Sequence, residues 1–264
     1  MTALDICALV IIAGASFGMS SLGAAVGLVL GHFRVVLLTY VLGGAVVGAA
    51  TSMAISTVST FSGVVSHARG GRVELGPLLL IGGPSAFAAY EVSRLAQGID
   101  PRAMKLLIAT MLVVAATDLF RRRYLTDTAG AQHARTSKAL WQRVALQAGV
   151  GLVLGATSGL VGLLLGSLRL PTMVRLGVKP STAVGTNMAI GAITGLSAGA
   201  SAVVGGHVNI VAFCVVAPFS LFGSWLGARK TAKLNPVALK TWIACALLVT
   251  ALIMVADLIF GPTR

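Results

Sequence analysis

The sequence predicts an all-α polytopic membrane protein made of two homologous repeats, with eight to ten transmembrane helices. Three observations support this prediction: few charges, long apolar runs and internal self-similarity. Charged residues make up only 10% of the 264 positions, and the mean hydropathy is +0.93. A soluble domain carries about 25% charged residues. The composition therefore excludes a soluble fold.

The apolar runs account for individual spans, because a helix needs about 20 apolar residues to cross the hydrocarbon layer. The runs are continuous rather than alternating, so they predict helices and not barrel strands. No Lys or Arg precedes the first run, which is therefore expected to remain as a span and not to be cleaved as a signal peptide. The uncharged runs that reach or approach the required length are 6–30, 75–90, 144–168, 210–228 and 241–256.

The repeat is visible when the sequence is shifted against itself by 135 residues, without a gap. GLVLGHFR at 27–34 then falls on GLLLGSLR at 162–169, so that Arg34 matches Arg169. Thr51 likewise matches Thr186. An ancestral duplication is the simplest explanation. Further matching segments are 70–75 with 205–210 and 99–105 with 234–240.

The duplication divides the chain into an N-terminal transmembrane repeat (1–120), a basic linker (121–143) and a C-terminal transmembrane repeat (144–264). In the first repeat, residues 35–65 are uncharged and too long for one span, so Gly43 and Gly44 are expected to break them. The matching segment of the second repeat opens with 170–180, a stretch that carries charges and two prolines and is expected to be re-entrant or interfacial.

The positive charge is best explained by membrane topology. A net charge of +13 could indicate nucleic-acid binding, but most Lys and Arg residues lie in short segments between the apolar runs. Such an excess marks cytoplasmic loops, so the linker is expected to face the cytoplasm, where it can also touch anionic lipid headgroups. The second basic segment, 229–240, should lie on the same side. Two segments on the same side are separated by an even number of crossings, here four, which corresponds to five spans per repeat. Repeats with an odd number of spans are inverted relative to each other.

A family resemblance rests on the segment 155–209, which combines a glycine-rich span, a following proline, an Ala-x-Gly-Thr-Asn motif and a Gly-His-Val turn. The pattern resembles the TauE/SafE sulfite exporter family. The first repeat resembles the family less closely and has Val36 in place of the proline. The residues that carry the pattern are Gly155, Gly159, Gly162, Pro171, Ala183, Gly185, Thr186, Asn187, Gly206, His207 and Val208.

The resemblance implies a multi-pass transporter of the bacterial inner membrane. Its expected activity is the export of a small sulfur-containing anion such as sulfite, an organosulfonate or a thiosulfate-like ion, by alternating access between the repeats. The expected partners are this anion and the lipid bilayer. Binding to nucleic acid is not expected, and the chain can be either a monomer or a homo-oligomer. The chain is expected not to be an enzyme, and no cofactor is indicated.

The candidate site residues are those able to donate hydrogen bonds to an anion within the membrane. Thr186 and Asn187, with their repeat mates Thr51 and Ser52, are expected to bind it near the midplane without holding it too tightly. Glycines next to them, in the segments 155–166 and 185–187, are expected to allow broken helices whose N-termini favour negative charge. Gly162 and Gly166 belong to the first of these segments.

Three further candidates have two interpretations each. Arg34 and Arg169 either form a paired cationic feature facing the pathway or extend to the headgroups. His207 is either a titratable donor for the anion or an ordinary interfacial histidine.

Two other functions compete with transport as explanations of the sequence. An intramembrane hydrolase would have to use Ser158 and His207, the one Ser/His pair worth considering, but nothing in the sequence fixes them together. A non-transporting accessory protein would have to recruit partners through the basic loops.

Overall fold

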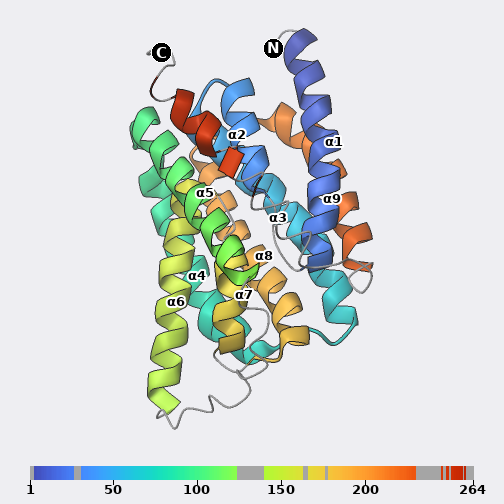
Figure 1. Cartoon of the computed structure of the whole chain (residues 1–264), viewed down its shortest axis with the longest axis vertical. Helices are drawn as coiled ribbons and strands as arrows, with labels where there is room; N and C mark the ends of the chain where they lie inside the picture. Colours follow the sequence, from blue (N-terminus) through green and yellow to red (C-terminus); the bar gives the residue numbers. More distant parts are fainter. Residues whose placement is uncertain are drawn as a thin grey trace.

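The computed structural model describes residues 3–26, 31–123, 140–162, 166–175 and 178–229, with short helical pieces between 245 and 259. The described part of the chain is helical and contains no strand. Figure 1 shows the arrangement of its main helices. They are α1 (Ala3–Val26), α2 (His32–Val41), α3 (Ala45–Arg69), α4 (Leu75–Ala96), α5 (Pro101–Arg123), α6 (Leu140–Val161), α7 (Gly166–Arg175), α8 (Pro180–Val204) and α9 (Ile210–Arg229).

Six of these helices, α1, α3, α4, α6, α8 and α9, are long and apolar enough to cross a membrane. The shortest, α9, has 20 residues, which corresponds to about 30 Å of helix, the thickness of the hydrocarbon layer. The all-helical, polytopic prediction is therefore confirmed. Helix α5 has 23 residues but carries several charges, and the predicted span at 241–256 lies largely outside the described residues. A total of eight to ten spans stays a prediction.

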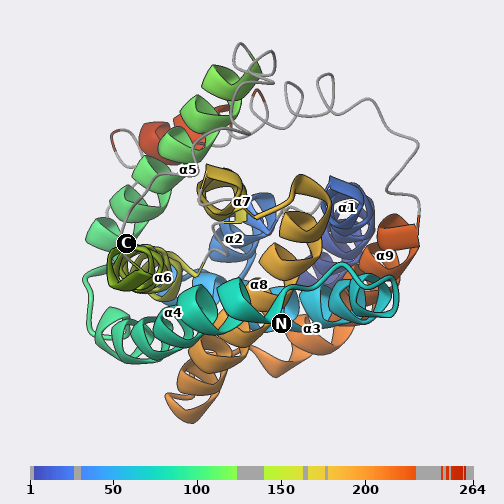
Figure 2. The same cartoon turned by 90° about the horizontal axis from the view of Figure 1, so that it is seen from below.

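Two short helices, α2 and α7, have 10 residues each and extend only about 15 Å, too little to cross the bilayer. The predicted break at Gly43 is confirmed, since this residue has φ +69° between α2 and α3, a conformation suited to glycine. Gly162, with φ +68°, likewise ends α6 before α7. The two short helices overlap in the end-on view of Figure 2, with α2 in the upper and α7 in the lower half of Figure 1.

The second predicted break, at Gly185 to Asn187, is wrong. Helix α8 runs through this motif without interruption. Pro180 starts the helix with a pre-set φ, and the Thr186 hydroxyl donates to the Thr182 carbonyl one turn earlier at 2.8 Å, which leaves the helical backbone intact. The Thr-Asn motif therefore lies inside a helix.

Helices α3 and α8 form the centre of the molecule: 61% and 67% of their spans are buried, against 28–39% for the other four spans. Helix α1 packs along α9 on one side of this pair, and α4 packs along α6 on the other (Figure 2). The short helices α2 and α7 pack against α3 and α8, respectively. The centre thus combines helices from both predicted repeats.

Glycines allow the outer helix pairs to approach backbone to backbone. A Cβ on Gly155 of α6 would meet the carbonyl oxygen of Ser85 on α4, and one on Gly223 of α9 would meet that of Phe17 on α1. Small residues are the usual means of close helix packing in membranes. Farther along, Gly159 meets Ala89 and Gly227 meets Ser21. Along each contact, the residue numbers increase together on both helices, so the two helices of each outer pair run parallel.

The two ends of the bundle differ in charge. We call the end where α6 begins the linker end; the turn from α3 to α4 lies there, against the start of α8 (Figure 1). The opposite end, where α5 begins, balances Arg94, Arg102 and Lys105 against Glu91, Asp100 and Asp257. One ion pair there joins Lys105 to Asp257 at 2.7 Å. The linker end carries Arg69, Arg72, Arg143, Lys179 and Arg229 against Glu74.

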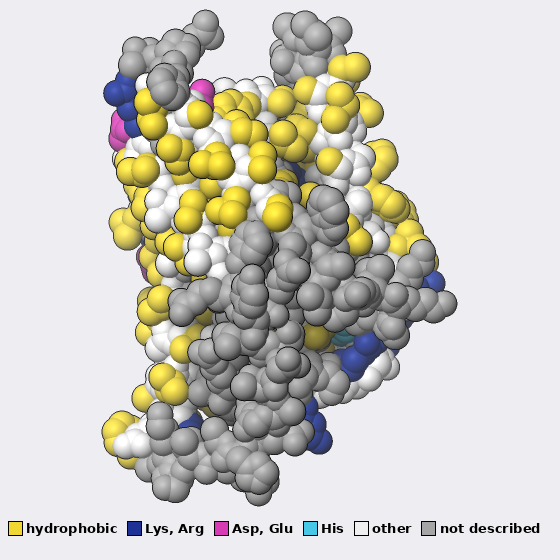
Figure 3. All heavy atoms as spheres, viewed as in Figure 1, with side chains coloured by type: hydrophobic (Ala, Val, Ile, Leu, Met, Phe, Trp, Pro, Cys, Tyr) yellow, Lys and Arg dark blue, Asp and Glu magenta, His cyan; other side chains and the backbone are white. Residues whose placement is uncertain are grey.

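The surface between the ends is mainly apolar. On the face shown in Figure 3, hydrophobic side chains cover most of the described surface, and Lys and Arg side chains gather near its margins. Exposed large hydrophobic residues such as Ile11, Leu79 and Val153 point outward from the long helices. This surface suits a lipid environment.

Candidate functional site

The short helices bring two arginines into the interior. Arg34 lies in the first turn of α2 and Arg169 in the first turn of α7. Only 5% of Arg34 and 0% of Arg169 is exposed. The interpretation that these side chains extend to the headgroups is therefore wrong. A charge at this depth is costly unless it finds polar partners, and each arginine turns toward serines on the neighbouring helices.

Arg34 is surrounded by hydroxyl groups. Its Nη1 donates to Ser220 Oγ on α9 at 3.0 Å, and its Nε donates to Ser52 Oγ on α3 at 3.4 Å. Its Nη2 donates to the Ser52 carbonyl at 3.2 Å and to Ser56 Oγ. Each guanidinium nitrogen of Arg34 therefore has a partner, and all of these partners are neutral.

Arg169 has fewer partners. Its Nη2 donates to Ser85 Oγ on α4 at 3.4 Å, a long contact. Its Nε and Nη1 are buried and have no hydrogen-bond partner among the described residues. These two atoms carry three of the five N–H donors of a guanidinium group. No carboxylate in the described part of the chain forms an ion pair with either arginine.

Arg34 and Arg169, each with the side chains bonded to it, form two groups that we call the arginine clusters. The two clusters correspond at the 135-residue shift. Arg34 reaches Ser220, and Arg169 reaches Ser85, so each arginine binds a serine of the other half. Ser52 Oγ donates to the Gly31 carbonyl at 3.4 Å, and its mate Asn187 donates through Nδ2 to the Gly166 carbonyl at 3.2 Å. Ser52 and Asn187 thus bind the start of the short helix that carries each arginine.

Thr51 and Thr186 bind turns of the opposite half. The backbone N–H of Asn209 donates to Thr51 Oγ1 at 3.0 Å, and that of Glu74 donates to Thr186 Oγ1 at 2.8 Å. Both threonines are fully buried. These matching bonds, which we call the threonine latches, fasten the turns that precede α4 and α9. Each turn also contains a glycine with positive φ.

The other predicted site residues lie outside the arginine clusters. Gly162 packs against the backbone of Ala49, at the end of α6. His207 lies in the turn between α8 and α9, and its Nδ1 makes no hydrogen bond to the described residues. Ser158 Oγ makes none either, so the Ser158–His207 pair required for a hydrolase is not formed in this structure.

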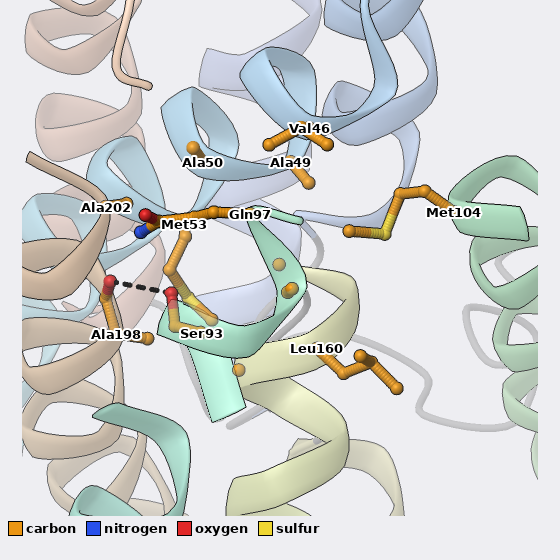
Figure 4. Close-up of a pocket in the computed structure, with 13 residues that line it drawn as sticks. Val46, Ala49, Ala50, Met53, Ser93, Gln97, Met104, Leu160, Ala198 and Ala202 are labelled. Carbon is orange, nitrogen blue, oxygen red and sulfur yellow. Dashed lines mark hydrogen bonds between the residues drawn. The ribbon is translucent and has the colours of Figure 1, made fainter. Parts of the chain in front are cut away.

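A small cavity lies elsewhere, between α3, α4, α5, α6 and α8 (Figure 4). Its volume is about 20 Å³, room for about one water molecule. Ser93 and Gln97 are its polar lining residues, and the Ser93 hydroxyl already donates to the Ala198 carbonyl at 3.3 Å. The arginines do not line it, so we do not regard it as the functional site.

Sequence reasoning missed the serines and the threonine that surround the arginines. Ser56, Ser85, Thr194 and Ser220 are all buried, and the Ser85 and Thr194 hydroxyls lie 2.9 Å apart. One signal was available, because Ser85 and Ser220 are themselves separated by 135 residues.

A lipid-compatible helix bundle with two buried arginines and several buried hydroxyl groups defines a polytopic membrane protein. The family model described as "Sulfite exporter TauE/SafE" matches residues 6–254. The chain therefore belongs to this family, which is a family of membrane transporters and not of enzymes. The chain is also similar to the "Probable membrane transporter protein YdhB" of Bacillus subtilis (strain 168). The two are 26% identical over 196 residues, which are 73% of this chain and 78% of that protein. No solved structure matches.

Proposed function

We propose that this protein exports a small sulfur-containing oxyanion, such as sulfite or an organosulfonate, across the bacterial inner membrane, and that the anion binds at a buried arginine between the two halves. One observation carries the proposal: Arg169 is fully buried, yet its Nε and Nη1 have no partner among the described residues. The family description supports sulfite as the first substrate to test.

The physical argument concerns the cost of a buried charge. An uncompensated buried ion is unfavourable by several kcal/mol, and hydroxyl groups compensate only part of this cost. An oxyanion supplies both the opposite charge and several acceptor atoms, and its bonds to a guanidinium are stronger than neutral ones. Arg169 also lies in the first turn of α7, where the helix dipole favours negative charge.

The predicted neutral residues keep a place in this proposal. Ser52 on α3 and Asn187 on α8 donate to the carbonyls at the starts of the short helices that carry the arginines. Thr51 and Thr186 fix the turns that precede α4 and α9 through the latches. Neutral donors replace part of the hydration of the anion and hold it less tightly than a further charge would, which allows release.

Alternating access is supported by the direction of the helices. Helix α6 begins at the linker end, and α1 begins at the opposite end (Figure 1). Their parallel partners α4 and α9 run in the same directions as α6 and α1, respectively. Helices that match at the 135-residue shift therefore run in opposite directions. Two halves of this kind are the plan on which many secondary transporters move around a central site.

The charge difference between the ends supports the orientation. Since Lys and Arg mark the cytoplasmic side, the linker end faces the cytoplasm and the chain begins on the periplasmic side. The export direction rests on the family description.

The test is anion flux through purified protein in sealed liposomes, under nitrogen to keep sulfite reduced. We expect saturable flux of labelled sulfite or an alkyl sulfonate, well above that of chloride and of protein-free liposomes. Flux by the protein alone excludes a purely accessory role. Absence of flux for sulfite, sulfonates and thiosulfate would contradict the proposal.

A further inference from the structure

The surroundings of the two arginines differ at three matched positions. On α3, Ser52, Ser56 and Ser59 follow one another at helical spacing, so they share one face. Their mates on α8 are Asn187, Gly191 and Thr194. The Ser56 hydroxyl beside Arg34 therefore has no counterpart beside Arg169, because Gly191 has no side chain.

We infer that the chain holds one oxyanion per molecule, at Arg169, and that the serine or glycine at positions 56 and 191 determines which arginine is available to bind it. This inference rests on the proposed function and assigns the site to one of the two arginines.

The hydrogen-bond donors of Arg34 are already bonded to side chains of the protein. Ser56 Oγ and Ser220 Oγ accept from two different nitrogens of its guanidinium, and Ser52 accepts from the third. There is also little room beside it, since a Cβ placed on Gly31 would lie 2.6 Å from Ser56 Oγ and 3.2 Å from Arg34 Nη2. An anion there would have to displace bonds that are already made.

Two of these differences leave Arg169 available. Gly191 offers it no hydroxyl, and the Ser85 hydroxyl lies 2.9 Å from Thr194 Oγ1 and 3.4 Å from Arg169 Nη2. In the first half, the mate of Thr194 is Ser59, which bonds instead to Ser20 at 3.3 Å. Ser220 is thereby left to accept from Arg34 at 3.0 Å.

The experiment is calorimetric titration of sulfite into the full-length protein in detergent, under nitrogen. The wild type should bind one sulfite per chain. Ser56→Ala removes a hydroxyl from Arg34 and should add a second binding event, raising the stoichiometry toward two. Gly191→Ser supplies the missing hydroxyl to Arg169 and should weaken binding about ten-fold or more. Gly191→Ala is the matched control for added volume and should change affinity less than about three-fold.

Arg169→Gln should abolish the single event, and Arg34→Gln should preserve it. Three results would overturn the inference: two sites in the wild type, binding lost in Arg34→Gln but kept in Arg169→Gln, or equal losses in Gly191→Ala and Gly191→Ser. Should Gly191→Ser fail to fold, the stoichiometry of Ser56→Ala still decides, because an unchanged value of one contradicts the inference. A wild type that binds no sulfite, sulfonate or thiosulfate refutes the proposed function itself.

Discussion

The two halves of the chain make the same bonds at the threonine latches but not at the buried arginines. Thr51 and Thr186 each accept one backbone N–H from the opposite half, at 3.0 and 2.8 Å. Arg34 has a partner for every guanidinium nitrogen, whereas the described residues offer Arg169 one long bond, to Ser85. The contacts that fix the backbone turns are thus the same in both halves, and the contacts of the two arginines differ. In our proposal, the exchange of serine for glycine at positions 56 and 191 within this shared framework leaves a single site.

The first prediction tests the framework and gives an all-or-none signal. Ala68 and Val203 are exposed residues 135 positions apart, in the last turns of α3 and α8. In a variant with Cys7, Cys214 and Cys245 replaced by alanine, Val203→Cys should react with a membrane-impermeant maleimide on intact cells. Ala68→Cys should react only after permeabilisation.

Such opposite labelling is what inverted halves require. Labelling of both cysteines from the same side would refute the inversion and would leave the family assignment intact.

The second prediction concerns the packing of the outer pairs. Gly155→Leu should place a side chain against the Ser85 carbonyl and destabilise the protein by about 3 kcal/mol or more. Gly149→Leu on the same helix is the control, because a Cβ there meets nothing within 4 Å. Size-exclusion profiles and thermal unfolding in detergent measure the difference. Equal behaviour of the two variants would argue against close contact between α4 and α6.

The third prediction concerns the latches, where we expect smaller and equal effects. Thr51→Val and Thr186→Val each leave one backbone N–H without its acceptor, and each should cost about 1–3 kcal/mol. Thr157→Val, which removes only bonds to carbonyls of its own helix α6, should cost less than about 0.5 kcal/mol. Thermal unfolding of the three variants provides the comparison. Loss of stability in one of the two variants, with unchanged stability in the other, would show that the two latches do not contribute equally.

Much of the fold could be predicted from the sequence, because lipid imposes strong rules on composition. Uncharged runs located α1, α6 and α9, and Gly43 predicted the break between α2 and α3. The predicted break at Gly185 failed, since glycine permits a break without requiring one, and the helical backbone of α8 is intact there.

The site was harder to predict. Whether Arg34 and Arg169 reach headgroups or point inward depends on how short α2 and α7 pack against α3 and α8, which hydropathy does not encode. A buried serine such as Ser56 or Ser85 resembles an ordinary packing residue in an apolar run. Its role depends on a neighbour far away in sequence, as the contact from Arg34 to Ser220 shows.

The most direct test of the account is the initial rate of sulfite flux in proteoliposomes for Arg169→Gln against the wild type, at equal amounts of folded protein. Without the cationic partner, we expect the rate at sub-saturating sulfite to fall at least about ten-fold, equivalent to about 1.4 kcal/mol. Ser62→Ala, which removes a hydroxyl bonded to backbone carbonyls between α3 and α9, should retain a rate close to that of the wild type. Undiminished, saturable sulfite flux in Arg169→Gln would contradict the account.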